Sequence, residues 1–439
     1  MVESAGRARS GWFDRRRWVR GRRWSLAVTA VLALIAAQTV LAVGASAAGS
    51  QTLYAAAAAS GSGDCSEANA CSLPTALGEL GAGGTILLVT SGPSAPSASS
   101  CSASDCYVGV FTVSTASSAA FPVTIEAAPG VTNATLDGNN NNNTVLTVDS
   151  GVDLNLVGVT ITGGNASQGG GILNNGTSSV VRSTITGNSA QNGPGGGILN
   201  NNGTLSVSQS TITGNSAVGG GGGIFNGGSI NGGTLSVVQS TITDNTAPGG
   251  DGGGIYNANG ATLSVVQSTI ASNTAQYGHG IVNRGSSTFL AGDVLATPGG
   301  APSGGECSGG GVTDGGFNVA DDNTCGFTST TSVVSANAGL LGSLADNGGP
   351  TETILPQVDN PVIGLIPQRT SVYDTVTNTT VELCPTVDQR GLASVSGGAC
   401  DAGAVQTSEL LYAAASGSGD CSEANACSLP TALGELGAG

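Results

Sequence analysis

His279 is the only histidine in this chain of 439 residues, and it is therefore the first candidate for acid–base chemistry. Enzymes that hydrolyse acidic glycans need clustered carboxylates, and the corresponding lyases need an Arg or Lys base with acidic calcium ligands. His279, however, stands where glycine occurs in the other copies of a repeated segment. We therefore expect a structural role for it.

The acidic residues near the repeats do not form a catalytic set either. Asp244 stands at a corner where other copies of the repeat have the sequence Thr-Gly-Asn. Asp251 lies in a glycine loop, and Asp321-Asp322 falls in a loop bounded by cysteines. We expect turn positions for all four. One histidine supplies no Ser/His/Asp set, and the glycine runs lack the Gly-Lys-Ser/Thr ending of a phosphate loop. The sequence thus predicts no catalytic residue, no metal site and no cofactor.

His279, Asp244 and Asp251 lie in a segment that occurs five times between residue 169 and about residue 296. Each copy contains Gly-Gly-Gly-Ile-x-Asn or a variant, and most continue Gly-Thr-Leu-Ser-Val-x-x-Ser-Thr-Ile-Thr-x-Asn-x-Ala. A fixed period of this length is typical of a solenoid. The third residue of each glycine run recurs at intervals of 26, 26, 31 and 26 residues, at Gly171, Gly197, Gly223, Gly254 and Gly280.

The residues within each period indicate which solenoid this is. Each copy holds two or three short β-prone runs with apolar alternation, separated by Gly and Asn, and none suits a helix. The pattern predicts an all-β fold, a right-handed single-stranded parallel β-helix with coils about 4.8 Å apart. We place it at residues 84–300. Early, less regular strands are expected at residues 85–89, 107–113, 123–126, 145–148 and 152–162.

Two columns of asparagine recur in register with the repeat. Amides stacked at a turn can hydrogen-bond to the next coil, and Asn tolerates the left-handed backbone that corners need. A corner needs the residue in every coil whereas a single binding site does not, so both columns are interpreted as structural ladders. One comprises Asn174, Asn200, Asn226, Asn257 and Asn283, and the other comprises Asn188, Asn215, Asn245 and Asn273.

The Thr-Ile-Thr runs suggest a candidate ligand face. Period-two geometry sends isoleucine inward and both threonines outward, so stacked coils would carry a double threonine column that breaks at Ala271. Such columns resemble the arrays of ice-binding solenoids, although Thr is also a favoured exposed strand residue. The candidate exposed face comprises Thr184, Thr186, Thr211, Thr213, Thr241 and Thr243.

Residues 1–47 are typical of an export signal, with a basic region, an apolar stretch and the cleavage motif Ala45-Ser46-Ala47. An uncleaved signal anchor is the alternative, and no later segment is expected to span a bilayer. Lysine is absent, and removing residues 1–47, with eight arginines and two acids, changes the formal net charge from −16 to −22. Such a surface repels nucleic acid and anionic headgroups.

Ten cysteines fall in close pairs, which favours local disulfides in an oxidising compartment. Metal binding is the alternative, but no spacing matches a zinc signature. The predicted disulfides are Cys65–Cys71, Cys101–Cys106, Cys307–Cys325, Cys384–Cys400 and Cys421–Cys427.

Residues 48–83 are predicted to cap the first coil. Ser72 can cap a short helix in which Leu73, Ala76, Leu77 and Leu80 form one apolar face. A cap is expected because an open β-helix end exposes unpaired strand edges.

Two further segments follow the β-helix. Residues 301–406 are predicted to hold C-terminal coils and a disulfide-bearing tail. Residues 416–439 repeat residues 60–83 without a change, so residues 407–439 are predicted to begin a second tandem copy that is cut short.

The repeats Gly-Gly-Gly-Ile-x-Asn and Ser-Thr-Ile-Thr-Gly-Asn-Ser-Ala resemble those of right-handed parallel β-helix surface proteins, including the polymorphic outer membrane protein type. The tail is similar to the end of the choice-of-anchor family of secreted β-helix proteins. The matching runs are Asn347-Gly348-Gly349-Pro350-Thr351-x-Thr353, Asp388-Gln389-Arg390-Gly391 and Cys400-Asp401-x-Gly403-Ala404. The resemblance implies an exported, surface-associated protein and supplies no catalytic residues.

The sequence therefore predicts a secreted or cell-surface, non-enzymatic β-helix protein for adhesion or carbohydrate contact. Its expected partners are glycans or other cell-surface components, and nucleic acid is not among them. A pectin-degrading lyase or hydrolase is the first alternative, because those enzymes share the β-helix. An ice-binding solenoid is the second.

Overall fold

The computed structural model describes most of the chain after the predicted export signal, which lies outside the described residues. The described residues are 51–57, 63–80, 83–90, 105–114, 122–132, 134–228, 232–298, 303–394, 398–407, 413–414, 418–422 and 425–428.

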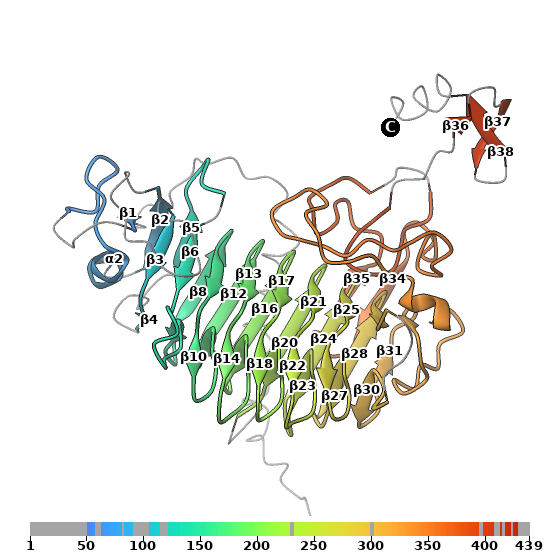
Figure 1. Ribbon diagram of the computed structural model, residues 1–439, viewed down its shortest axis with the longest axis horizontal. Coiled ribbons are helices and arrows are strands. Elements are labelled where there is room, and N and C mark those ends of the chain that lie inside the picture. The colour runs from blue at the N-terminus through green and yellow to red at the C-terminus, as the bar shows by residue number, and fades with distance from the viewer. Residues whose placement is uncertain are drawn as a thin grey trace, which may run out of the picture. The chain divides into compact units, whose positions relative to one another are not determined.

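Four parallel sheets run along the body of the protein, and successive coils lie side by side in Figure 1. In each regular coil the chain passes through an Ile-x-Asn strand, a long strand, a Thr-Ile-Thr strand and a Ser-Ala strand, and we name the four sheets after these. One such coil comprises β15 (Ile198–Asn200), β16 (Thr204–Ser208), β17 (Thr211–Thr213) and β18 (Ser216–Ala217). The predicted all-β parallel solenoid is confirmed.

The other strands belong to the same four sheets. The long-strand sheet contains β1 (Gln51–Ala56), β2 (Gly84–Val89), β5 (Val123–Ala127), β8 (Asp153–Val157), β12 (Thr177–Val181), β20 (Thr234–Val238), β24 (Thr262–Val266), β28 (Ser287–Ala291) and β31 (Thr313–Asp314). The Thr-Ile-Thr sheet contains β3 (Cys106–Val108), β6 (Thr135–Asp137), β9 (Thr160–Thr162), β13 (Thr184–Thr186), β21 (Thr241–Thr243), β25 (Thr269–Ala271), β29 (Val294–Ala296), β32 (Val319–Ala320) and β33 (Val333–Val334). The Ile-x-Asn sheet contains β4 (Phe111–Val113), β7 (Leu146–Val148), β11 (Ile172–Asn174), β19 (Ile224–Asn226), β23 (Ile255–Asn257), β27 (Ile281–Asn283) and β30 (Cys307–Gly309). The Ser-Ala sheet contains β10 (Asn165–Ala166), β14 (Ser189–Ala190), β22 (Thr246–Ala247) and β26 (Thr274–Ala275).

Two predicted early strands are each divided by a turn. Residues 107–113 hold parts of β3 and all of β4, and residues 152–162 hold β8 and β9. Gly109 and Gly158 lie at these breaks with φ of +152° and +65°, conformations that few other residues adopt. The cap segment also supplies a strand that was not predicted, because β1 pairs in parallel with β2.

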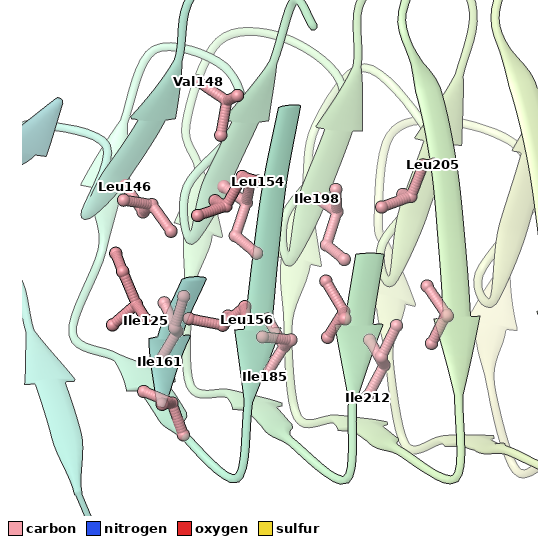
Figure 2. Packing of buried hydrophobic residues seen from close by; sticks show 14 of the residues in the cluster. Ile125, Leu146, Val148, Leu154, Leu156, Ile161, Ile185, Ile198, Leu205 and Ile212 are labelled. Atoms are coloured by element: carbon pink, nitrogen blue, oxygen red, sulfur yellow. The ribbon is translucent and has the colours of Figure 1, made fainter. Parts of the chain in front are cut away.

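Identical residues stack along the core because the strands pair in register. Ile185 pairs with Ile212, and Leu205 pairs with Leu235, and all four side chains are buried. Figure 2 shows the side chains of Ile185, Ile212 and Leu205 pointing into the space that the strands enclose. The alternation of apolar and small polar residues thus directs one face of every strand into a continuous core.

Hydrogen bonds join the asparagines of both columns into ladders. Asn174 Nδ2 donates to Asn200 Oδ1 at 2.8 Å, and the same contact continues through Asn226 and Asn257 to Asn283. In the other column each amide donates to the next at 2.9–3.0 Å, from Asn188 through Asn215 and Asn245 to Asn273. All nine side chains are buried and have little access to water. Each amide therefore obtains its hydrogen-bond partners from the amides of neighbouring coils.

A third ladder lies before the Thr-Ile-Thr strands and was not predicted. The hydroxyl of Ser210 accepts a hydrogen bond from Ser183 N of the preceding coil, and Ser240 and Ser268 continue the pattern. Asp293 takes the next position, accepting from Ser268 N at 2.8 Å. Asp293 is fully buried, and this burial raises the pKa of its carboxyl well above the ordinary value, although two backbone N–H groups oppose the shift.

The N-terminal cap forms as the sequence predicts. Helix α2 (Leu73–Glu79) begins after Ser72, whose hydroxyl accepts a hydrogen bond from Thr75 N, and buries Leu73, Ala76 and Leu77. The neighbouring Cys65–Cys71 disulfide closes the loop before it. The cap therefore covers the apolar end of the first coil.

Three of the five predicted disulfides lie in described residues: Cys65–Cys71, Cys307–Cys325 and Cys384–Cys400. Cys106 is disulfide-bonded, and its predicted partner Cys101 lies outside the described residues. The side chains of Cys421 and Cys427 also lie outside them. No helix in the described part of the chain is long and apolar enough to cross a membrane.

The second copy of the cap sequence is described only in part. Residues 413–428 contain the short strands β36 (Ala413–Ala414), β37 (Ser418–Ser422) and β38 (Asn425–Ser428). The predicted second cap helix lies outside the described residues.

Candidate functional site

The predicted threonine face is mostly covered, which corrects the expectation that it is exposed. Thr211, Thr213, Thr241 and Thr243 are buried, whereas Thr184 and Thr186 are half-buried. Residues 336–406, orange to red-orange in Figure 1, include the η1 turn (Ala336–Gly339) and the hairpin β34 (Ser371–Asp374) and β35 (Thr379–Glu382). We call residues 336–406 the C-terminal segment. It packs on the outer faces of the later coils.

A second apolar core holds this segment in place. Outward-facing Val266, Phe289 and Val294 pack with Ile354 and Ile366 of the C-terminal segment, and all five are buried. Phe289 and Val294 thus place apolar residues where the preceding coil carries Ser264 and Thr269. The break at Ala271 is the sequence signal for this change.

Polar contacts extend the attachment over the threonine columns. Gln389 Nε2 lies 2.9 Å from Thr211 Oγ1 and 3.0 Å from Thr351 Oγ1, and Thr241 Oγ1 donates to Gln389 Oε1 at 2.7 Å. The adjacent Asp388 accepts from Arg390 Nε and Nη2 at 2.8 and 2.6 Å. The Asp-Gln-Arg-Gly run therefore docks the C-terminal segment onto the coils.

The coil that pairs with His279 carries acids that the sequence did not group with it, and His279 N donates to Gly305 O of that coil. Gly280 N donates to Glu306 O, and Glu306 N donates to Asp322 Oδ2 at 3.1 Å. Thr297 joins the acids, since its hydroxyl donates to Glu306 Oε1 at 2.7 Å and its N–H to Asp321 Oδ2 at 2.8 Å. No three metal-ligating side chains converge anywhere in the described residues.

The carboxyl of Glu306 has a pKa well above its ordinary value. Burial raises the pKa of Glu306 to about 8, and the charges of Asp321 and Asp322 add to the increase, while the Thr297 hydroxyl opposes it. A raised pKa is a property of catalytic acids. Glu306 is only 1% exposed, however, so a polymeric substrate could not reach it in this conformation.

The other two acids considered from the sequence lie apart from this cluster. Asp244 occupies a left-handed corner at φ +56°, and partial burial raises its pKa. Asp251 forms an ion pair with Arg284 at 3.3 Å. Both occupy turns, as predicted.

An outward apolar column follows the Ile-x-Asn sheet. The rings of Phe225 and Tyr256 stack with centroids 4.9 Å apart and planes 11° apart. The strands on either side present Leu199 and Val282 in the same register, and both are buried. Each ring face is therefore turned toward a neighbouring coil, and the stack has a structural role rather than offering a platform for a ligand.

An open groove lies at the corner between the Ile-x-Asn strands and the long strands. The groove has a volume of about 500 Å³ and is lined by Asp149, Ser150, Asn175, Asn201 and Asn202. Asp149 and Ser150 follow β7, Asn175 follows β11, and Asn201 and Asn202 follow β15, so three successive coils contribute. We call this feature the corner groove.

Hydrogen bonds fix part of the groove lining. Asn175 Nδ2 donates to Val148 O at 3.3 Å, and Asn201 Nδ2 donates to Asn175 Oδ1 at 2.8 Å. No intramolecular hydrogen bond within the described residues involves the Asp149 carboxylate or the Ser150 hydroxyl. The groove therefore combines positioned amides with a carboxylate and a hydroxyl that can bind a ligand.

Sequence reasoning missed this groove. The doubled asparagines Asn174-Asn175 and Asn200-Asn201 were the available signal, because only the first of each pair belongs to the buried ladder. The second of each pair projects from the corner.

Comparisons with known proteins add little beyond the fold. No protein-family profile and no curated protein sequence matches the chain. The crystal structure of pectate lyase Pel9A is similar at 14% sequence identity and a TM-score of 0.37, covering 82% of this chain and 97% of that chain. A similarity of this size says nothing about activity.

Proposed function

We propose that this protein is exported and contacts carbohydrate outside the cytoplasm without cleaving it. The observation that carries the proposal is the corner groove, whose five lining residues are all polar. Carboxamides donate and accept hydrogen bonds, carboxylates accept them and hydroxyls do both, so together they match neighbouring hydroxyls of a sugar. An apolar ligand would need a lining of the opposite kind.

The disulfides support the location. Three closed disulfides are typical of an oxidising compartment, whereas in the cytoplasm such thiols would stay reduced. The predicted export signal at residues 1–47 and the resemblance to surface β-helix proteins point the same way.

The groove lining favours binding over cleavage. Most glycosidases use a pair of carboxylates that flank the scissile bond. The lining of the corner groove contains a single carboxylate, that of Asp149. A lyase would need a cation there, and none of the five lining residues is cationic. The ice-binding alternative loses support because Thr211 and Thr241 are covered.

A glycan array probed with the secreted protein tests the proposal, beside a reducing-sugar assay on pectic substrates. We expect binding without release of reducing ends, and we expect Asn201→Ala and Asp149→Ala to weaken binding at least tenfold. Asn259→Ala is the matched control, because Asn259 is exposed at the same corner but lies outside the groove. Binding to no glycan, or equal binding by all three variants, would overturn the proposal.

A further inference from the structure

We infer that the corner groove takes a neutral, extended glycan chain lying along the solenoid axis, with one sugar unit beside each coil. The inference rests on the proposed function and specifies its ligand. It follows from the direction of the groove, the fixed amides and the local charge.

The direction comes from the strand register. Val148 pairs with Asn174, and Asn174 pairs with Asn200, so the residues that follow them lie at the same corner in three neighbouring coils. Parallel strands lie about 4.8 Å apart. This spacing is comparable with the length of one pyranose unit in an extended chain. A chain along the axis therefore meets equivalent polar groups at each sugar.

The amides are positioned before a ligand arrives. The contacts to Val148 O and Asn175 Oδ1 use one hydrogen of each carboxamide, so Asn175 and Asn201 each keep a second N–H hydrogen. Ladder contacts also restrict the rotamers of both side chains. Binding then costs less ordering entropy than it would with mobile side chains.

The charge selects a neutral chain. Asp149 is the only charged residue of the lining, and it would repel a uronate carboxylate while accepting hydrogen bonds from hydroxyls. Arg284, further along the same corner, is already paired with Asp251 at 3.3 Å. An acidic polysaccharide therefore finds repulsion at one coil and no unpaired cation in the groove.

Titration calorimetry with oligosaccharides of one to six units tests chain length and charge. The probes are cello-, manno- and xylo-oligosaccharides as neutral series, and oligogalacturonides as the acidic series. We expect at least one neutral series to gain about fivefold in affinity per added unit up to about three units and then level off. Oligogalacturonides of equal length should bind at least tenfold more weakly.

Variants test the assignment of sugars to coils. Asn201→Ala should remove the affinity gained on passing from two units to three, whereas Asn259→Ala should leave the length dependence unchanged. Asp149→Asn should narrow the difference between neutral and acidic series.

Three results would overturn the inference while leaving carbohydrate contact intact. They are array hits with no gain in affinity with length, tighter binding of oligogalacturonides than of every neutral series, and a length dependence that Asn201→Ala does not change. Failure of all glycans to bind would instead remove the proposed function itself.

Discussion

The carboxamide oxygen of Gln389 lies 2.7 Å from the hydroxyl of Thr241, which donates a hydrogen bond to it. The two residues are 148 positions apart in sequence, and both are buried. The contact places the C-terminal segment over a threonine column that would otherwise face solvent. One glutamine thus links the tail to a repeated feature of the solenoid.

Gln389→Ala should lower the free energy of unfolding by roughly 2–4 kcal/mol, because it leaves the Thr211, Thr241 and Thr351 hydroxyls buried with fewer partners. Denaturant unfolding measures the change, and limited proteolysis should cut the C-terminal segment faster. Gln357→Ala is a comparison at an exposed glutamine whose side chain, among the described residues, donates to Leu341 O within the C-terminal segment. Equal protease resistance of Gln389→Ala and the unaltered protein would contradict the docking role.

Asn215→Ala should destabilise the solenoid by roughly 1–3 kcal/mol. The buried amide of Asn215 donates to Asn245 Oδ1, Ile185 O and Thr213 O, and its oxygen accepts from Asn188. Urea midpoints check the prediction, with the exposed Asn259→Ala as control. Unchanged midpoints for both Asn215→Ala and Asn245→Ala would refute the ladder.

Glu306 should make the free energy of unfolding fall as pH rises from about 4.5 to about 8. Burial raises its pKa to about 8 from an ordinary value of 4.5, so the folded state binds the proton more tightly than the unfolded chain. The contribution is complete below about pH 4.5 and is lost as pH rises toward 8, with a magnitude of up to about 5 kcal/mol.

Glu306→Gln keeps the shape of the neutral carboxyl and removes its titration, so the decline in the free energy of unfolding between about pH 5 and 8 should become shallower. Chemical denaturation at several pH values measures it. Glu382→Gln, at an exposed acid, should leave the slope as it is. If Glu306→Gln does not alter the pH dependence of the free energy of unfolding, the pKa of Glu306 is not raised in the folded protein.

His279→Gly should leave glycan binding intact, because His279 lies outside the corner groove and its ring, among the described residues, bonds only to Asn273 O at 3.2 Å. The array assay above checks this. Loss of a glycan-cleaving activity on this substitution would favour the hydrolase alternative.

The local features of the fold could be read from the sequence because they depend on short-range periodicity. Alternation in Thr-Leu-Ser-Val-Val fixes which side chains point inward, and a repeat in every coil makes equal residues pair. The cap helix could be predicted for the same reason, since Ser72 and the spacing of Leu73, Ala76 and Leu77 are local signals. In-register stacking then follows for the asparagine ladders.

Only the tertiary structure decided which outward face is available. The Thr-Ile-Thr runs alone cannot show that a segment more than 100 residues later covers Thr241, because that contact depends on long-range packing of Val266, Phe289 and Ile354. The corner groove likewise needs three coils in register before Asp149, Asn175 and Asn201 line one surface. Sequence determined what each coil presents, and packing between distant segments determined what remains open to a ligand.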